Sequence, residues 1–301
     1  MLEPRPVLAL KGGGGGTFGV VTRLTLRTHD LPEWFGIVAM SIQAASAQAY
    51  RRLLGRFVGF YAASLLNPHW GEIVKLRSPN LLDINLEFQG LDRQRAEAIW
   101  RPFIEFVTGS PQDYTIRRPP VMLDTAARNR WDPAFFKANA PTAIMTDDRP
   151  GASADNIFWS GNLAESGHFL HGFQSIWLPS SLLRPEQQDG LADALFAASR
   201  LWTVELLFQK GLAGASDDVI AATRDTATNP AVLDACLLAI IASEGPPAYQ
   251  GLRGHEPDLA AARRDARMIG AAMNQLKALV PDAGCYVAES DFFEPNWQAA
   301  Y

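Results

Sequence analysis

Cysteine is scarce in this chain, where Cys236 and Cys285 are the two among 301 residues. Two cysteines are too few for a disulfide framework, so they point to neither an oxidising nor a reducing compartment. Cys236 lies in the apolar run 235–241, where we expect a small buried side chain. The sequence also lacks a Gly-x-Ser-x-Gly motif, and neither cysteine has a histidine close by in sequence, which argues against a hydrolase.

Long apolar runs and basic clusters are missing as well. No stretch reaches the length of a membrane span, and residues 1–6 have neither the charged nor the apolar part of a signal peptide. We therefore expect no membrane partner and favour a cytoplasmic location, although the sequence does not fix the compartment. The net charge of −5, without a run of lysine or arginine, argues against a nucleic-acid partner.

Histidines give no metal site. His168 and His171 are three residues apart on an extended segment, so their side chains should point to opposite faces. No cysteine or carboxylate pair completes a ligand set around them. We therefore expect no metal.

With 48% hydrophobic and 20% charged residues, the composition suits a globular protein of one or two domains with a large core. The oligomeric state stays open.

Residue periodicity switches repeatedly between that of strands and that of helices. Alternation with β-branched residues predicts six strands, at 34–42, 71–77, 82–88, 173–178, 203–209 and 233–242. Apolar stripes at helical spacing predict four helices, at 47–61, 93–107 with a kink at Pro102, 185–199, and from an N-cap at Asp258 to a stop at Pro281. Residues 117–156 show no sustained period and are predicted to be an irregular excursion.

This order is not a strict strand–helix–strand alternation. It predicts an α+β fold in which helices cover one face of a mostly antiparallel sheet.

Five consecutive glycines, Gly12 to Gly16, run directly into an alternating stretch. Glycine loses much conformational entropy on folding, so such a run indicates either a flexible turn or a backbone that must approach a ligand closely. The spacing Gly14-x-Gly16-x-x-Gly19 matches a dinucleotide-binding loop, but that loop opens a helix, whereas residues 20–26 alternate like a strand. No Gly-Lys-Ser/Thr follows, which excludes a phosphate-binding P-loop.

The glycine run and its continuation Thr17-Phe-Gly-Val-Val-Thr22 resemble the end of the flavin-binding domain of berberine-bridge-enzyme-like FAD-linked oxidases, in the vanillyl-alcohol oxidase superfamily. Far along the chain, Tyr286-Val-Ala-Glu-Ser-Asp-Phe-Phe-Glu-Pro-Asn-Trp-Gln298 resembles the tail motif of the same family. The two motifs stand in the family's order, about one substrate domain apart. Together they are more specific than either motif is alone.

This resemblance implies an organisation in three parts. Residues 1–30 would be a C-terminal remnant of the FAD-binding domain, residues 31–284 the substrate domain, and residues 285–301 the berberine-like tail that returns to the flavin domain. We expect a fragment that lacks most of the flavin domain and is inactive by itself. The full-length form would be an FAD-dependent oxidoreductase that passes a hydride from a small organic substrate to the flavin, with dioxygen as electron acceptor.

The resemblance also implies site residues. Tyr286 and Glu289 would be catalytic, with Glu289 at a position where some relatives carry the tyrosine that deprotonates substrate; Ala288 stands where asparagine is common. A buried carboxylate beside a flavin can act as a general base. Residues expected to approach FAD are Gly13, Gly14, Gly15, Gly16, Phe18, Gly19, Val20 and Tyr286.

Plainer interpretations remain open. Glu289 or Asp291 would equally suit a cap for the turn before Pro295. Substrate-side candidates on the expected sheet and the loop after it are Glu205, Gln209, Glu244 and Tyr249, each of which would also suit solvent or packing. The alternative to an enzyme is a non-catalytic binding or scaffold module that does not hold FAD.

Overall fold

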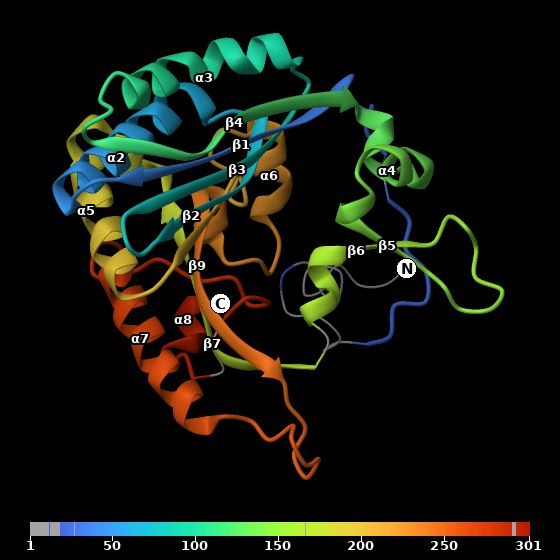
Figure 1. Cartoon of the computed structure of the whole chain (residues 1–301). Helices are drawn as coiled ribbons and strands as arrows, with labels where there is room; N and C mark the ends of the chain where they lie inside the picture. Colours follow the sequence, from blue (N-terminus) through green and yellow to red (C-terminus); the bar gives the residue numbers. More distant parts are fainter. Residues whose placement is uncertain (1–11, 13–18, 27, 166, 291–292) are drawn as a thin grey trace.

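The computed structural model describes residues 12, 19–26, 28–165, 167–290 and 293–301 (Figure 1). Its centre is a seven-stranded sheet in the order β4-β1-β3-β2-β8-β9-β7, in which every neighbouring pair is antiparallel. The strands are β1 (Trp34–Ala44), β2 (Trp70–Arg77), β3 (Leu81–Gln89), β4 (Tyr114–Ala126), β7 (His168–Pro179), β8 (Val204–Phe208) and β9 (Ala235–Pro247). A separate small sheet pairs β5 (Ile144–Thr146) with β6 (Ile157–Trp159).

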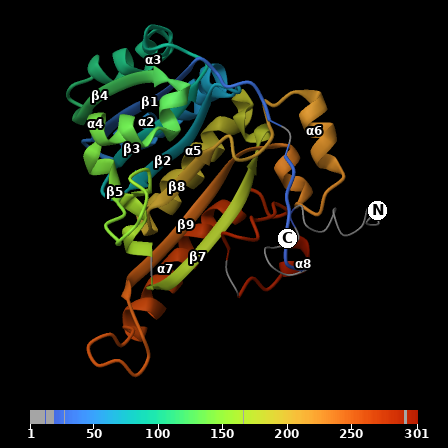
Figure 2. The ribbon, with the colours of Figure 1, turned by 90° about the vertical axis from the view of Figure 1, so that its right-hand side faces the viewer.

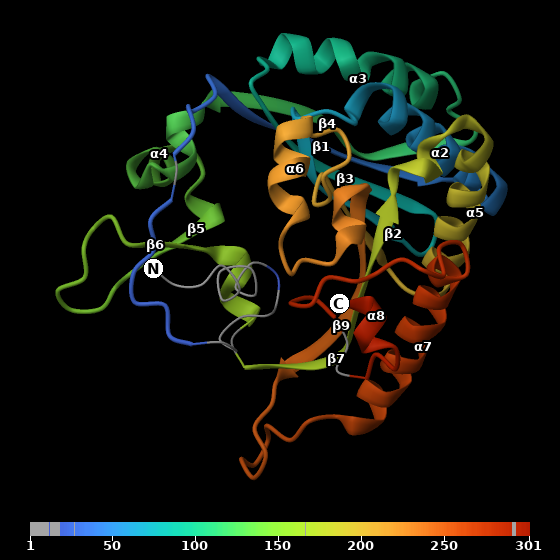
Figure 3. The same ribbon diagram turned by 180° about the vertical axis from the view of Figure 1, so that it is seen from behind.

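The four longest helices pack on one side of this sheet, as the sequence predicts. The α-helices are α2 (Ala47–Phe60), α3 (Arg93–Thr108), α4 (Pro133–Asn139), α5 (Pro185–Leu201), α6 (Asp217–Arg224), α7 (Leu259–Lys277) and α8 (Trp297–Ala300). Figures 1 and 3 show α2, α5 and α7 together along one side, with α4, β5 and β6 standing away on the other. None of the helices in the described part of the chain is long and apolar enough to cross a membrane.

Side-chain alternation gives the sheet two different faces. We call the side under α2, α3, α5 and α7 the covered face; it carries the buried residues Val38, Met40, Val74, Ile84, Leu86, Leu206, Ala239 and Ile241. The opposite side is the open face, to which Lys75, Glu205, Leu207 and Ile240 belong. The predicted α+β class, with helices on a mostly antiparallel sheet, is confirmed.

Local sequence signals set several helix starts. Ser46 accepts a hydrogen bond from the Ala49 N–H at 3.1 Å and caps α2, and Asp92 caps α3 through the Arg95 N–H at 2.8 Å. The predicted N-cap Asp258 accepts from the Ala261 N–H at 2.9 Å and begins α7. A cap of this kind satisfies one of the backbone donors that the first turn of a helix leaves unpaired.

The prediction of an irregular segment at 117–156 is wrong in its first part. Residues 114–126 form β4, an edge strand that pairs only with β1 in the seven-stranded sheet. Pro119 and Pro120 lie within it, next to a shift of register between Ala39 and Ser41 of β1. An edge strand tolerates prolines and charged residues because one of its sides needs no ladder hydrogen bonds, and this obscures the alternation in the sequence.

The strand predicted over 20–26 is also not found. Residues 19–26 have no strand assignment, and Val20, Val21, Leu24 and Leu26 are between 61% and 91% exposed. Alternation alone does not make a strand, because its N–H and C=O groups need a neighbouring strand to pair with. No described strand pairs with this stretch.

Aromatic packing between α2 and α3 anchors the covered face. The ring of Phe103 lies 5.8 Å from that of Phe57, 5.3 Å from Phe60 and 5.9 Å from Trp100, and Phe103 is fully buried.

We predict that Phe103→Ala lowers the free energy of unfolding by about 3–5 kcal/mol, through lost burial and the cavity left behind. Denaturant unfolding would measure it, with the exposed Leu252→Ala as control; equal effects of the two substitutions would contradict this packing.

Candidate functional site

A large cavity lies on the open face of the sheet, with a volume of about 1380 Å³. Its floor comes from β2, β8, β9 and β7, and its walls come from the 3-10 turn before β7 and from the C-terminal segment after α7. The residues that line it are Ile73, Lys75, Gly161, Glu165, His168, Leu170, Phe173, Glu205, Leu207, Ile240, Ala242, Ser243, Glu244, Val287, Ala288, Glu289, Ser290, Glu294, Trp297 and Tyr301. The volume exceeds the 300–1,000 Å³ typical of a small-molecule pocket.

The floor of the cavity is apolar in its centre. Ile73 and Leu207 are cross-strand partners on β2 and β8, and Ile240 and Ala242 follow on β9. These side chains come from neighbouring strands and share one face, so together they present a flat hydrophobic surface. Such a surface suits a planar ring or another apolar body lying against the sheet.

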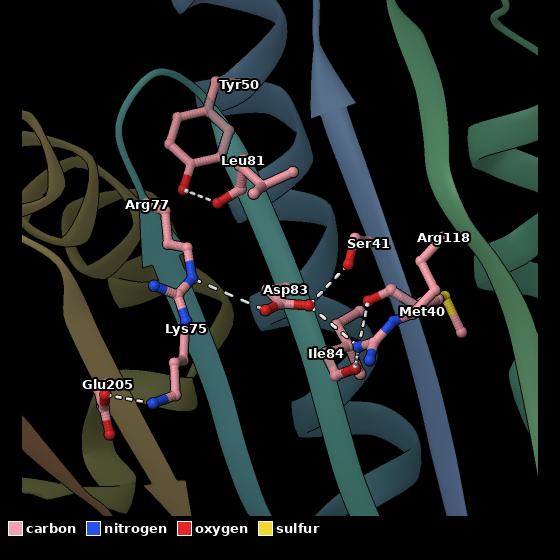
Figure 4. A network of polar contacts seen from close by, with 10 residues as sticks. All are labelled: Met40, Ser41, Tyr50, Lys75, Arg77, Leu81, Asp83, Ile84, Arg118 and Glu205. Carbon is pink, nitrogen blue, oxygen red and sulfur yellow. Dashed lines mark hydrogen bonds and ion pairs between the residues drawn. The ribbon is translucent and has the colours of Figure 1, made fainter. Parts of the chain in front are cut away.

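Charged side chains on the open face are paired across the strands, and one of these pairs, Lys75 with Glu205, lines the cavity. The Lys75 ammonium donates a hydrogen bond to the Glu205 carboxylate, its direct partner in the β2–β8 register (Figure 4). Further along the same face, Asp83 accepts from the Ser41 hydroxyl at 2.6 Å and from Arg118 at 3.0 Å, and it lies 3.7 Å from Arg77. Antiparallel pairing places these opposite charges side by side.

Glu289 lies in the tail wall of the cavity and is half-buried. Burial raises the pKa of its carboxyl group, and the nearby Glu205 carboxylate raises it further, while Lys210 acts in the opposite direction. A carboxylic acid whose pKa is raised holds a proton more readily than an exposed glutamate does. Its site is thus suited to exchange a proton with a ligand in the cavity.

Backbone and side-chain contacts hold the tail against the sheet edge. The Trp177 N–H donates to the Gly284 carbonyl at 2.9 Å, and the Tyr286 N–H donates to the Ser175 hydroxyl at 3.2 Å. Lys277 at the end of α7 pairs with Glu294 at 2.7 Å. Figure 2 shows the C-terminal segment running beside β7 and β9. These bonds fix the wall that carries Glu289.

The structure brings together three of the carboxylates that the sequence suggests. Glu289, Glu205 and Glu244 all line the cavity. Gln209 does not, because its amide donates to the Leu65 carbonyl at 3.1 Å, and Tyr249 lies outside the lining too. The ring of Tyr286 lies 6.2 Å from that of Trp177 rather than in the lining, so its catalytic role stays a prediction.

The glycine-run residues cannot be placed in this site. Gly13, Gly14, Gly15, Gly16 and Phe18 lie outside the described residues. Gly19 and Val20 are described, and Val20 is 91% exposed. Their expected contact with FAD therefore also stays a prediction.

Sequence reasoning missed several residues of the site. His168, considered only as a metal ligand, lines the cavity with its Nδ1 atom 2.9 Å from Oε2 of Glu244. Lys75, Glu294 and Tyr301 were missed altogether, since their proximity depends on strand register and on the path of the tail. Among the described residues, no group of three or more His, Cys, Asp or Glu side chains is placed to hold a metal ion.

Comparisons with known proteins place this geometry in context. No protein-family profile matches the chain. An FAD-linked oxidoreductase, easE of Trichophyton verrucosum (strain HKI 0517), is 35% identical over 104 residues, which cover 33% of this chain and 17% of that protein. The VAO-type flavoprotein MtVAO615 of Myceliophthora thermophila C1 superposes with a TM-score of 0.61 at 19% identity, covering 97% of this chain and 46% of that one.

Two further solved structures agree. The flavoenzyme CrmK of caerulomycin biosynthesis has a TM-score of 0.58 at 17% identity, over 96% of this chain and 57% of that one. Physcomitrella patens BBE-like 1 has a TM-score of 0.58 at 9% identity, over 91% of this chain and 49% of its own. The chain thus spans about half the length of these solved structures. It has the fold of the corresponding half of VAO-type and berberine-bridge-enzyme-like flavoproteins, as the two sequence motifs indicate.

Proposed function

We propose that this chain forms the substrate-binding part of an FAD-dependent oxidoreductase that oxidises a small organic molecule. The observation that carries the proposal is the cavity on the open face, with an apolar floor on the sheet and, in the tail wall, the Glu289 carboxylate, whose pKa is raised by burial. Residues 31–284 would supply the floor and residues 285–301 the closing wall. The fold shared with flavoproteins and the sequence match to an FAD-linked oxidoreductase support this assignment.

The cavity fits one end of FAD better than the other. Its flat apolar centre, formed by Ile73, Leu207, Ile240 and Ala242, suits a planar ring system. Five glutamates and one lysine line the cavity, and the lysine is paired with Glu205. A pyrophosphate needs clustered N–H donors or cations. We therefore propose that the ring end of FAD lies over this face and that the phosphates are held elsewhere, with Gly13 to Gly16, Phe18, Gly19 and Val20 approaching the cofactor.

Bound FAD would supply a hydride acceptor. The substrate's body would lie between the apolar floor and the flavin ring, and the floor would exclude water from beneath the substrate. Glu289 would take the proton from the oxygen or nitrogen of the substrate at the carbon being oxidised, and the Glu289 oxygen atoms are the acceptors for it. Tyr286 would help to place the tail against the sheet, where its N–H bonds to Ser175. Dioxygen is the proposed final electron acceptor.

We expect the chain, expressed by itself, to bind FAD weakly and to be inactive. The described cavity offers no cluster of cations or backbone donors for the phosphates, and losing such contacts costs several decades of affinity. Absorbance at flavin wavelengths after purification and titration with FAD would measure this. A yellow protein with one tightly bound flavin per chain would contradict it.

Glu289→Gln tests the proposed base in a form of the enzyme that holds FAD, with the flavin-binding domain restored. Glutamine keeps the shape of the side chain but does not accept the proton, so flavin reduction by substrate should slow by about 10²–10⁴-fold while flavin binding persists. Anaerobic stopped-flow bleaching of the flavin isolates this step from reoxidation. Glu186→Gln, on the exposed first turn of α5, is the matched control. Tyr286→Phe should have a smaller effect if the ring, and not the hydroxyl, is what matters.

The proposed base also predicts how the rate of flavin reduction changes with pH. A base must be deprotonated to act, so the reduction rate should rise as the pH increases through the pKa of Glu289. Because burial and Glu205 raise that pKa, the rise should lie above the ordinary glutamate range near 4.3. Glu289→Gln should abolish this limb of the profile. An unchanged pH profile in the variant would mean that another group is the base.

A further inference from the structure

The cavity has a second polar cluster that the proposed proton transfer does not use. His168 at the start of β7 and Glu244 near the end of β9 both line the cavity, and Nδ1 of His168 lies 2.9 Å from Oε2 of Glu244. Ser243 on β9 and Glu165, just before β7, line the same region. The imidazole is mostly covered, with 21% of its side-chain surface exposed.

Strand register separates this cluster from the part of the floor where Glu205 lies. Glu205, which interacts electrostatically with Glu289, is the direct cross-strand partner of Ile240. Glu244 is four residues further along β9, on the same face, and an extended strand advances about 3.3 Å per residue. Ile240, in register with Glu205, and Glu244 therefore lie about 13 Å apart along β9. A ligand that spans from the Glu205 end of the floor to Glu244 must be elongated.

The chemistry of the far cluster is that of a hydrogen-bond acceptor. His168 lies against the Glu244 carboxylate without bonding to it, because Nδ1 is 2.9 Å from Oε2 of Glu244 but has no hydrogen-bond partner in the described part of the chain. A neutral imidazole has one acceptor nitrogen, whichever of its nitrogens carries the proton. Glu244 and Glu165 add carboxylate oxygens, which are acceptors only when ionised. The lysine in the lining, Lys75, is paired with Glu205. This end of the cavity therefore offers acceptors and repels anions.

We infer that His168 and Glu244 form a recognition subsite for a hydrogen-bond donor, a hydroxyl or an ammonium group, at the far end of an elongated substrate whose apolar body lies on the sheet. The subsite sets specificity and leaves the proton transfer to Glu289. The inference rests on the proposed function only in taking this cavity as the substrate site. It excludes substrates that carry a carboxylate or a phosphate at that end.

Four rigid two-ring probes of matched length test this on the purified chain, without flavin. They are biphenyl-4-ylmethanol, the corresponding primary amine, its trimethylammonium derivative and biphenyl-4-carboxylate, with binding followed by calorimetry. We expect the alcohol, the amine or both to bind at least tenfold more tightly than the trimethylammonium ion and the carboxylate, because a hydrogen bond to a charged or polarised acceptor is worth about that much. The better of the alcohol and the amine identifies the donor.

Two substitutions locate the preference. His168→Phe keeps a planar ring without an acceptor, and Glu244→Gln removes the carboxylate from a half-exposed position that should tolerate it. Each should reduce the donor preference about tenfold. The control Glu256→Gln lies in the loop after β9, outside the cavity lining, and should leave the preference intact.

Several outcomes would overturn the subsite: equal affinity for the amine and the trimethylammonium ion, tightest binding of the carboxylate, no binding of any probe, or a donor preference that survives both substitutions. The test is separable from that of the proposed function. A normal rate of flavin reduction in the Glu289→Gln enzyme would remove the proposed base and leave the probe result standing. A slow Glu289→Gln enzyme, together with no preference for donor probes, would support the proposed base and remove the subsite.

Discussion

Antiparallel pairing of seven strands is the constraint on which the rest of this structure depends, because it decides which side chains share a face. On one face, alternate residues of β1, β3, β2, β8 and β9 form the larger apolar core and are buried by α2, α3, α5 and α7. Burial of that face supplies the main driving force for folding. The other face carries a smaller buried cluster around Trp177, Leu207, Leu238 and Ile240, and the rest of it carries charges and a cavity, since an antiparallel sheet need not be covered completely on both faces.

The open face is organised by pairs across the strands. Lys75 and Glu205 are in direct register, and Asp83 on β3 interacts with Ser41 on β1, Arg77 on β2 and Arg118 on β4 (Figure 4). These groups are partly exposed, so each pair adds little stability. Their effect is to fix side chains in place at the border of an apolar floor. A site assembled on strands in this way is held more rigidly than one built on loops.

The C-terminal segment converts this face into a site. Contacts of Gly284 and Tyr286 with β7, together with the Lys277–Glu294 pair, hold the segment so that Glu289 lines the same cavity as Glu205. Two carboxylates are thereby brought together from positions 84 residues apart in sequence, and burial adds to their mutual effect on the pKa of Glu289. A flexible tail would leave the same glutamate in water, with no reason for its pKa to shift.

The sequence by itself determined the elements with strong local signals. The strands at 34–42 and 82–88, the helix capped by Asp258 and the α+β class follow from alternation, apolar stripes and capping residues, which act over a few neighbouring positions. The tail motif also directed attention to Glu289, which does line the cavity. Only tertiary structure decided the rest: that 114–126 is an edge strand despite its prolines, that 20–26 has no strand partner among the described residues, and that His168 meets Glu244. Strand order and register bring these residues together, and both are set by contacts between segments far apart in the chain, which no local pattern encodes.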